Sequence, residues 1–237
     1  MKILIVDTET TGLDASAEVC ELAATLCVLG KDTNELPYFG AISSISTVAS
    51  FIGENNAFEI NRINPNVARE AWMFSPDMID VMVYLAHRAD YIVSFVAEFD
   101  KPHWAKYVSE IPWICAQTDF DWGYKFKERF KLVDLALWLG IGVSFSHRAG
   151  DDVRLLVECF NRIDKLQERF DRAIERSRSP WVELQAFVSF QDKELAKNAN
   201  FGWDKQQKKW LKKVKECDRE AFVAGLNFEV GVANEPV

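Results

Sequence analysis

Apolar runs separated by short polar interruptions open the chain, and this pattern predicts strands joined by turns. Apolar residues dominate three early segments, 2–6, 19–29 and 36–42. Runs of this length are typical of β-strands. A polar stretch over 7–12 separates the first two runs, so we expect a hairpin within an antiparallel or mixed sheet. Two acids, Asp7 and Glu9, would then directly follow the first strand.

Helical spacing of apolar positions begins further along the chain. In "SPDMIDVMVYLAHRA", Ser75 is a favourable N-cap and Pro76 suits the first helical position. Apolar residues then recur at helical spacing. Three further helices are predicted, one that starts near Asp100 and two over 130–141 and 149–178. Strands are predicted at Tyr91–Phe95 and in "PWICAQ".

The stretch "SRSP" (177–180) is the best candidate for a domain boundary. We therefore expect one domain over residues 1–176 and a small appendage over 181–237. Strands that alternate with helices on a mixed sheet indicate an α/β fold for the first domain. The shorter elements that follow indicate an α+β fold for the appendage.

The composition indicates a globular protein with a substantial core. Of 237 residues, 49% are hydrophobic and 13% aromatic. No apolar run approaches the roughly 18–20 residues that span a bilayer. Acids appear too early in "MKILIVDTE" for a secretory signal, so we expect a cytoplasmic location. The five cysteines are odd in number and scattered, which favours reduced thiols over a disulfide framework or a zinc site.

The net charge of −8 argues at first against a polyanionic partner, but the charge is unevenly distributed. The segment 205–215 carries six lysines and no acid, which leaves the rest of the chain at −14. This asymmetry fits an acidic, metal-requiring body with a basic attachment. It fits equally well an acidic enzyme with one solvated lysine face.

Asp7 and Glu9 stand at i and i+2, so on a strand both side chains point to the same face. Two carboxylates this close repel each other, and one pKa rises unless a cation lies between them. Hard divalent ions such as Mg²⁺ and Mn²⁺ prefer oxygen ligands of this kind. Taken alone, the pair fits either a metal site or a turn that Asp7 caps while Glu9 is solvated.

Other polar residues have simple structural explanations when each is taken alone. Asp100 suits a helix N-terminus, and Asp151 and Asp152 open a helix whose dipole they complement. His147 precedes that helix. A lone histidine is more often structural or exposed than catalytic, as we expect for the other two histidines of the chain.

Three short motifs change this interpretation when they are taken together. These are "VDTETTGL" near the start, "VAEFD" about ninety residues on, and "HRAGDD" about fifty further on. Their order and spacing resemble the DnaQ-like (DEDDh) 3′–5′ exonuclease family, whose motifs are D-x-E after a strand, an aspartate after a small-x-Phe run, and H-x(4)-D. The resemblance covers residues 1 to about 170. It implies a ribonuclease H-like mixed sheet flanked by helices.

The resemblance assigns roles to five residues. It implies that two Mg²⁺ or Mn²⁺ ions are held by four carboxylates, those of Asp7, Glu9, Asp100 and Asp152. Two such ions stabilise the attacking and the leaving oxygen of an in-line displacement at phosphorus. His147 would be the general base, because an unperturbed pKa of about 6.5 suits proton transfer near neutral pH.

The second motif departs from the family pattern, and the third contains two neighbouring aspartates. Members often have "HNAxFD" in the second motif, whereas this chain has "SFVAEFD". The usual polar pair is absent, which affects substrate contacts there but spares the ligand Asp100. In the third motif, the five-residue step from His147 selects Asp152. Asp151 is then the residue that complements the helix dipole.

The turn after the first two acids is where the resemblance places recognition of the 3′ end. Thr8, Thr10 and Leu13 would hold the terminal nucleotide, and Leu13 would wedge against the last base. The alternative for Leu13 is a core leucine that follows a turn.

The C-terminal stretch "LAKNANFGWDKQQKKWLKKV" resembles a small module of the form LAK-x-x-G-x-x-W-x(6)-W, which is appended to various nucleic-acid enzymes. Two tryptophans, Trp203 and Trp210, alternate there with lysines, namely Lys205, Lys208, Lys209, Lys212 and Lys213. Such a set is able to stack bases and contact phosphates. The alternative, which we favour for the tryptophans, is the core of a domain too small to fold otherwise. The lysines would still lie near a bound strand.

The resemblance thus implies a 3′–5′ exonuclease that acts on single-stranded or frayed DNA ends and releases nucleoside 5′-monophosphates. An exoribonuclease is one alternative, because the same site serves both polymers. A non-catalytic nucleic-acid-binding or polymerase-tethering subunit is the other, although a pure binder needs no such set of acids. The sequence shows no polymerase domain, so proofreading would require a polymerase partner, and repair is an equally open setting.

Overall fold

The computed structural model describes residues 1–14, 16–49, 53–70, 76–123, 130–144 and 147–233. The chain divides into two compact units, Met1–Ile174 and Glu175–Val237. Within the described residues, no helix is long and apolar enough to cross a membrane. The predicted N-cap Ser75 lies outside these residues.

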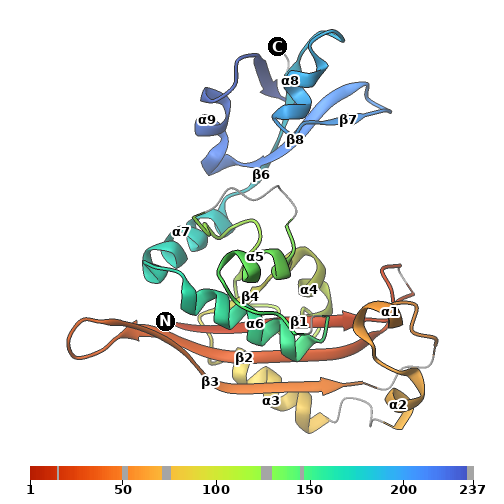
Figure 1. The fold of residues 1–237 in the computed structure, drawn as a ribbon, viewed down its shortest axis with the longest axis vertical. Coiled ribbons are helices and arrows are strands. Elements are labelled where there is room, and N and C mark those ends of the chain that lie inside the picture. The colour runs from red at the N-terminus through yellow and green to blue at the C-terminus, as the bar shows by residue number, and fades with distance from the viewer. Residues whose placement is uncertain (15, 50–52, 71–75, 124–129, 145–146, 234–237) are drawn as a thin grey trace. The chain divides into compact units, whose positions relative to one another are not determined.

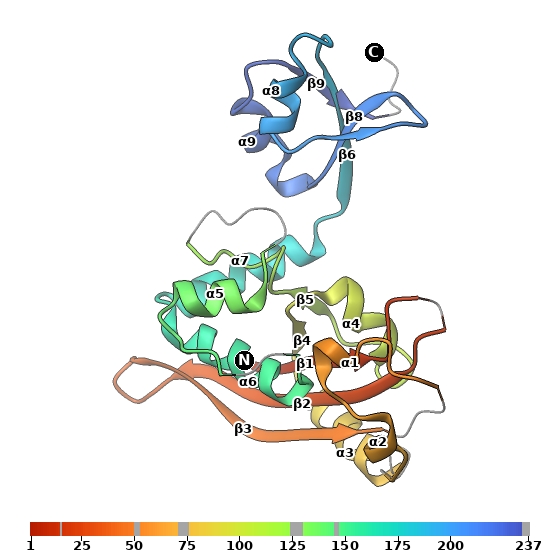
Figure 2. The ribbon, with the colours of Figure 1, turned by 45° about the vertical axis from the view of Figure 1, so that its right-hand side comes forward.

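The first unit is built on a five-stranded sheet with the strand order β3-β2-β1-β4-β5 (Figures 1 and 2). Its strands are β1 (Lys2–Thr10), β2 (Val19–Lys31), β3 (Pro37–Val48), β4 (Tyr91–Ser94) and β5 (Trp113–Cys115). The pairs β1–β2 and β2–β3 are antiparallel, whereas β1–β4 and β4–β5 are parallel. The predicted hairpin and the predicted mixed sheet are therefore confirmed.

Helices cover both faces of this sheet. They are α1 (Phe58–Asn61), α2 (Pro65–Glu70), α3 (Pro76–Ala86), α4 (Ala97–Trp104), α5 (Leu132–Trp138), α6 (Ala149–Arg162) and α7 (Leu166–Arg178). Ile3 and Ile5 of β1 belong to the core shared with α5, α6 and α7. Leu4 and Val6 belong to the core shared with α3 and α4. The alternation of side chains along β1 thus supplies both cores from one strand.

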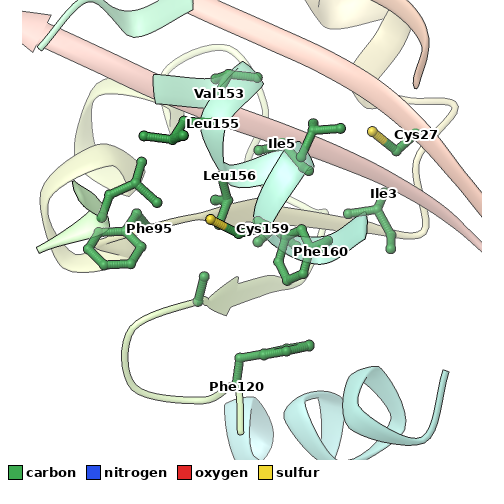
Figure 3. Packing of buried hydrophobic residues seen from close by; sticks show 14 of the residues in the cluster. Ile3, Ile5, Cys27, Phe95, Phe120, Val153, Leu155, Leu156, Cys159 and Phe160 are labelled. Carbon is green, nitrogen blue, oxygen red and sulfur yellow. The ribbon is translucent and has the colours of Figure 1, made fainter. Parts of the chain in front are cut away.

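The buried face of α6 lies against the first strand. Figure 3 shows Phe160 of α6 close to Ile3 and Ile5 of β1, and all three belong to one apolar cluster. Asp7 and Glu9 continue the same odd-numbered series along β1. Apolar packing in the middle of β1 therefore directs the two acids toward the α6 side of the sheet.

β1 extends through Thr10, so the prediction that the first strand ends at residue 6 was wrong. Asp7 pairs with Ala23, and Glu9 pairs with Glu21 of β2. The neighbouring strand supplies backbone hydrogen bonds that hold these polar residues in the sheet, which outweighs their weak intrinsic preference for strands. Both acids consequently lie on a rigid strand.

Two helical predictions are corrected. α4 begins at Ala97, three residues before the predicted start near Asp100, and Asp100 lies in its first turn. The predicted single helix over 149–178 is two helices, α6 and α7. Lys165, between them, has a φ of +53°, which a right-handed helix cannot accommodate. The apolar spacing did not reveal this break, because both helices pack on the same core.

The second unit has a four-stranded antiparallel sheet with the order β7-β8-β6-β9. Its elements are β6 (Trp181–Phe187), α8 (Lys193–Asn198), β7 (Gly202–Asp204), β8 (Lys209–Lys215), α9 (Glu216–Ala224) and β9 (Glu229–Val232). A small core of its own contains Leu184, Ala186, Ala196, Phe201 and Val214. The predicted α+β architecture of this region is confirmed.

Candidate active site

Asp7 and Glu9 form the β1 part of the site, and both are partly buried. Burial raises the pKa of Glu9 to about 8, and the charges of Asp152 and Glu21 add to the rise. Burial, followed by the charge of Asp100, raises the pKa of Asp7 well above its ordinary value. Acids from separate parts of the sequence therefore share one electrostatic environment.

Asp100 reaches the same environment from α4. Its side chain is buried, and burial raises its pKa to about 7, while Thr8 opposes part of the rise and Asp152 adds to it. Among the described residues, the buried Oδ1 of Asp100 has no hydrogen-bond partner. Burying a carboxylate oxygen without a partner is costly. A bound cation or a proton on this oxygen would remove that cost.

The start of α6 contributes His147 and Asp152. The backbone N–H of His147 donates to Oδ2 of Asp152 at 3.0 Å. One ligand atom each from Glu9, His147 and Asp152 lie within 4.8 Å of one another. Burial raises the pKa of Asp152 to about 6, and the His147 N–H opposes the rise. His147 is exposed and has a φ of +64°, a strained conformation that is found often at functional sites.

A fifth acid, Glu21, adjoins these residues but has a cationic partner. Nε and Nη2 of Arg148 donate to its two oxygens at 2.8 and 2.9 Å. The N–H of Ala149 donates at 3.0 Å and the hydroxyl of Ser46 at 3.2 Å. Neither Glu21 nor Arg148 was predicted to belong to the site. A lone acid inside the apolar run 19–29 was the available signal, because such an acid has to find a partner.

The remaining four acids fit a site for divalent cations. Burial and mutual repulsion raise their pKa values, and a dication would relieve both effects. Carboxylate oxygens are also the donors that Mg²⁺ and Mn²⁺ prefer. Because Arg148 neutralises Glu21, the set that matches such a cation is Asp7, Glu9, Asp100 and Asp152.

The three residues predicted to hold a strand end differ in exposure. Thr8 and Thr10 are buried: Thr8 Oγ1 accepts from Nε1 of Trp104 at 3.1 Å, and Thr10 Oγ1 donates to the carbonyl of Gly12 at 2.6 Å. Leu13, by contrast, is 90% exposed, so the alternative of a core leucine was wrong. Only Leu13 of the three presents its side chain to solvent.

The aromatic and basic residues of the second unit also differ in their exposure. Lys205 and Lys208 are exposed in the turn that joins β7 to β8, and Trp203 beside this turn is 47% exposed. Trp210 packs on the core of the unit, with its ring centroid 5.3 Å from that of Trp203. The interpretation of the tryptophans as core residues therefore fits Trp210 better than Trp203.

Alternation along β8 divides the remaining lysines. Lys212 lies on the same side as Trp210, its Nζ is 5.0 Å from the ring centroid of Phe222, and burial lowers its pKa. Lys209 and Lys213 point to the opposite side of the sheet. The lysines of this segment thus do not form one continuous surface.

Family models match both parts of the chain. A model described as Exonuclease (RNase_T) matches residues 4–160, about two thirds of the sequence. A model described as a domain of unknown function (DUF8626) matches residues 182–232. No curated protein matches the chain. The chain therefore belongs to the RNase T exonuclease family and is a nuclease of the DnaQ-like type, within the ribonuclease H-like superfamily.

Proposed function

We propose that this nuclease is a metal-dependent 3′–5′ exonuclease that shortens single-stranded or frayed DNA ends and releases nucleoside 5′-monophosphates. The observation that carries the proposal is a cluster in which Glu9, His147 and Asp152 place ligand atoms within 4.8 Å of one another, and in which Asp7 is repelled by the charges of Asp100, Asp152 and Glu9. Within it, Oδ1 of Asp100 is buried and without a partner among the described residues. A binding protein would have no use for so costly a cluster.

The proposed metal ligands are the four acids, Asp7, Glu9, Asp100 and Asp152. Two Mg²⁺ or Mn²⁺ ions, when bound, would stabilise negative charge on the oxygens of the scissile phosphate. The protein's part is to hold these carboxylates in place on β1, α4 and α6. The site could receive a polyanion only with such cations bound, because they would offset the negative charge of the carboxylates.

We assign His147 the role of general base. Its ring is exposed, and one ring nitrogen lies within 4.8 Å of carboxylate oxygens of Glu9 and Asp152, so it borders the site. It would accept a proton from the water that attacks phosphorus. The bond from phosphorus to the 3′ oxygen of the preceding nucleotide then breaks, and the released nucleotide keeps its 5′-phosphate.

Recognition of the strand end is proposed for the residues that follow the acids. Leu13 has its side chain in solvent and would pack against the terminal base. The hydroxyls of Thr8 and Thr10 are used within the protein. The backbone of Thr8 also bonds Asp100, and the carbonyl of Thr10 accepts from Nδ2 of Asn61, so contacts of these threonines with substrate would use the backbone groups that remain. Ile5 is the last residue of β1 that pairs with β4. Beyond Ile5, the backbone of β1 is therefore not paired with β4.

A ladder assay tests polarity, sugar preference and metal dependence together. DNA and RNA oligonucleotides of one sequence, labelled at the 5′ end, are incubated with Mg²⁺, Mn²⁺ or EDTA. We expect a ladder of progressively shorter labelled DNA with either ion, slower loss of RNA, and no reaction in EDTA. Immediate release of labelled mononucleotide would show the opposite polarity. Faster loss of RNA would favour the exoribonuclease, and degradation that persists in EDTA would overturn the metal site.

We further propose that hydrolysis belongs to residues 1–176 and that the region 181–237 contributes to binding of the strand. The exposed part of the β7–β8 hairpin combines Trp203 with Lys205 and Lys208. An exposed aromatic ring stacks on any base, and lysines contact phosphates without regard to sequence. This hairpin is thus suited to hold a single strand of any sequence.

Replacing Lys205 and Lys208 together by glutamine should weaken binding of single-stranded DNA and reduce its dependence on salt. Each lost phosphate contact lowers the slope of log affinity against log salt by about 0.7 for single strands. Fluorescence anisotropy of the full chain in EDTA measures binding without hydrolysis. The matched control is Lys193→Gln with Lys197→Gln on α8, which removes the same charge from the same unit. Equal slopes for the two double variants would make the hairpin purely structural.

A further inference from the structure

Glu21 joins the sheet to the segment that carries His147 and Asp152. It lies near the start of β2, directly opposite Glu9 of β1, and only 3% of it is exposed. Its carboxylate accepts four hydrogen bonds, of which three come from Arg148 and Ala149. These are the two residues that immediately follow His147.

The hydrogen bonds continue from this contact to the site. The backbone carbonyl of Arg148 accepts from the N–H of Asp152 at 2.9 Å. Oδ2 of Asp152 in turn accepts from the N–H of His147 at 3.0 Å. Fixing Arg148 therefore fixes the first turn of α6 and, through it, both residues. The left-handed conformation of His147 requires such support, because it is unfavourable by itself.

The packing around Glu21 leaves little room for other arrangements. A Cβ added to Gly150 would lie 3.0 Å from Oγ of Ser46, the residue whose hydroxyl donates to Glu21. Because Gly150 has no Cβ, α6 lies close enough to β3 for the start of α6 to reach Glu21. Because its oxygens already accept from Arg148, Ala149 and Ser46, Glu21 is unsuited to be a fifth metal ligand.

We propose that Glu21 is a positioning residue, which holds the start of α6 so that His147 and Asp152 face Glu9. The proposal rests on the function proposed above, because it assigns His147 and Asp152 their roles. In this arrangement Glu21 and Arg148 act as one unit, and loss of the half-buried Arg148 would leave the charge of Glu21 buried without its partner.

The test compares Glu21→Gln with wild type by two measurements. Hydrogen exchange of the metal-free full chain should show faster exchange across residues 147–155, while α3 keeps wild-type protection. Turnover of labelled oligonucleotide should fall about 10- to 100-fold, the usual effect of losing a residue that orients metal ligands, with little change in KM. Arg154→Gln is the control, since it removes only the exposed pair with Asp151 on the same helix.

A double-mutant cycle separates positioning from general destabilisation. Glu21→Gln combined with Arg148→Gln should lose clearly less turnover than the product of the two single losses, because the two side chains act as a unit. Ser46→Ala, which removes one hydrogen bond of 3.2 Å, is the mild variant if Glu21→Gln fails to fold, and it should accelerate exchange over 147–155 alone.

Unchanged exchange over 147–155, or a turnover equal to that of wild type, would overturn the role of Glu21. So would acceleration of exchange that is uniform across the first unit, because that pattern reports only lost stability. A wild-type protein that hydrolyses no nucleic acid would instead overturn the proposed function. In that case hydrogen exchange would still decide whether Glu21 holds the start of α6.

Discussion

Asp152→Asn will reduce hydrolysis by about 10³-fold or more, whereas Asp151→Asn will leave the rate within about twofold of wild type. The two residues are neighbours in the first turn of α6, but they face different surroundings. Asp152 has a carboxylate oxygen within 4.8 Å of ligand atoms of Glu9 and His147. Asp151 is 44% exposed at its side chain and lies 4.0 Å from Arg154.

The pair forms a matched comparison, because both substitutions remove one charge from the same helical turn. Single-turnover rates on a 5′-labelled oligonucleotide at saturating Mn²⁺ measure the effect, and circular dichroism confirms that both variants are folded. Asp7→Asn should resemble Asp152→Asn, and the double variant should be little worse than either, since one ligand set fails as a unit. A rate for Asp151→Asn as low as that for Asp152→Asn would refute the assignment of the third motif.

The second large effect concerns stability of the metal-free protein, which should fall as the pH rises from about 5 to 8. Burial and repulsion raise the pKa to about 6 for Asp152, about 7 for Asp100 and about 8 for Glu9. In the unfolded chain these carboxyls titrate near pH 4. The folded protein therefore keeps protons that the unfolded chain releases. The stabilisation is complete below about pH 4 and is lost as the pH passes through the folded pKa values.

A fall on the order of 3 kcal/mol is expected, because one pKa unit corresponds to about 1.4 kcal/mol and because Glu9 and Asp152 are only partly buried. Divalent cations should reverse it at pH 8, where a ligand at about 100 times its Kd contributes about 2.7 kcal/mol. Asp152→Asn should show a shallower fall and a smaller gain from Mn²⁺. The site would then resemble other functional clusters that reduce stability until a ligand is bound.

Thermal unfolding at several pH values, in EDTA and in Mn²⁺, measures both effects. Asp151→Asn is again the control and should follow wild type. Burial also lowers the pKa of His103, but this residue contributes equally to wild type and to both variants. A melting temperature in EDTA that is independent of pH between 5 and 8 would contradict the prediction, as would equal stabilisation of Asp152→Asn and wild type by Mn²⁺.

The fold and the candidate site were predictable where their signals are local. Pro76 at a helix start, the alternation of Ile3 to Glu9 and the spacing of His147 to Asp152 each depend on a few neighbouring residues. Local signals failed where packing decided the outcome. The extension of β1 past Val6 depends on its pairing with β2, and the break at Lys165 depends on how two helices meet one core.

The sequence by itself determined which residues are the candidates for the chemistry. Its three motifs point to Asp7 and Glu9, to Asp100, and to His147 with Asp152, and the family match over residues 4–160 confirms the resemblance that they indicated. A motif consists of residue types and their spacing, and both can be read from the sequence without coordinates. For the same reason, a motif gives no account of the groups that lie around it in space.

Only the tertiary structure decided how these residues are held and which neighbours take no direct part. It showed that Glu21, unremarked in an apolar strand, is neutralised by Arg148 some 127 residues away in sequence. It also showed that Thr8 and Thr10 point inward while Leu13 points to solvent. The physical reason is that burial and charge pairing depend on contacts between distant segments, which no single stretch of sequence contains.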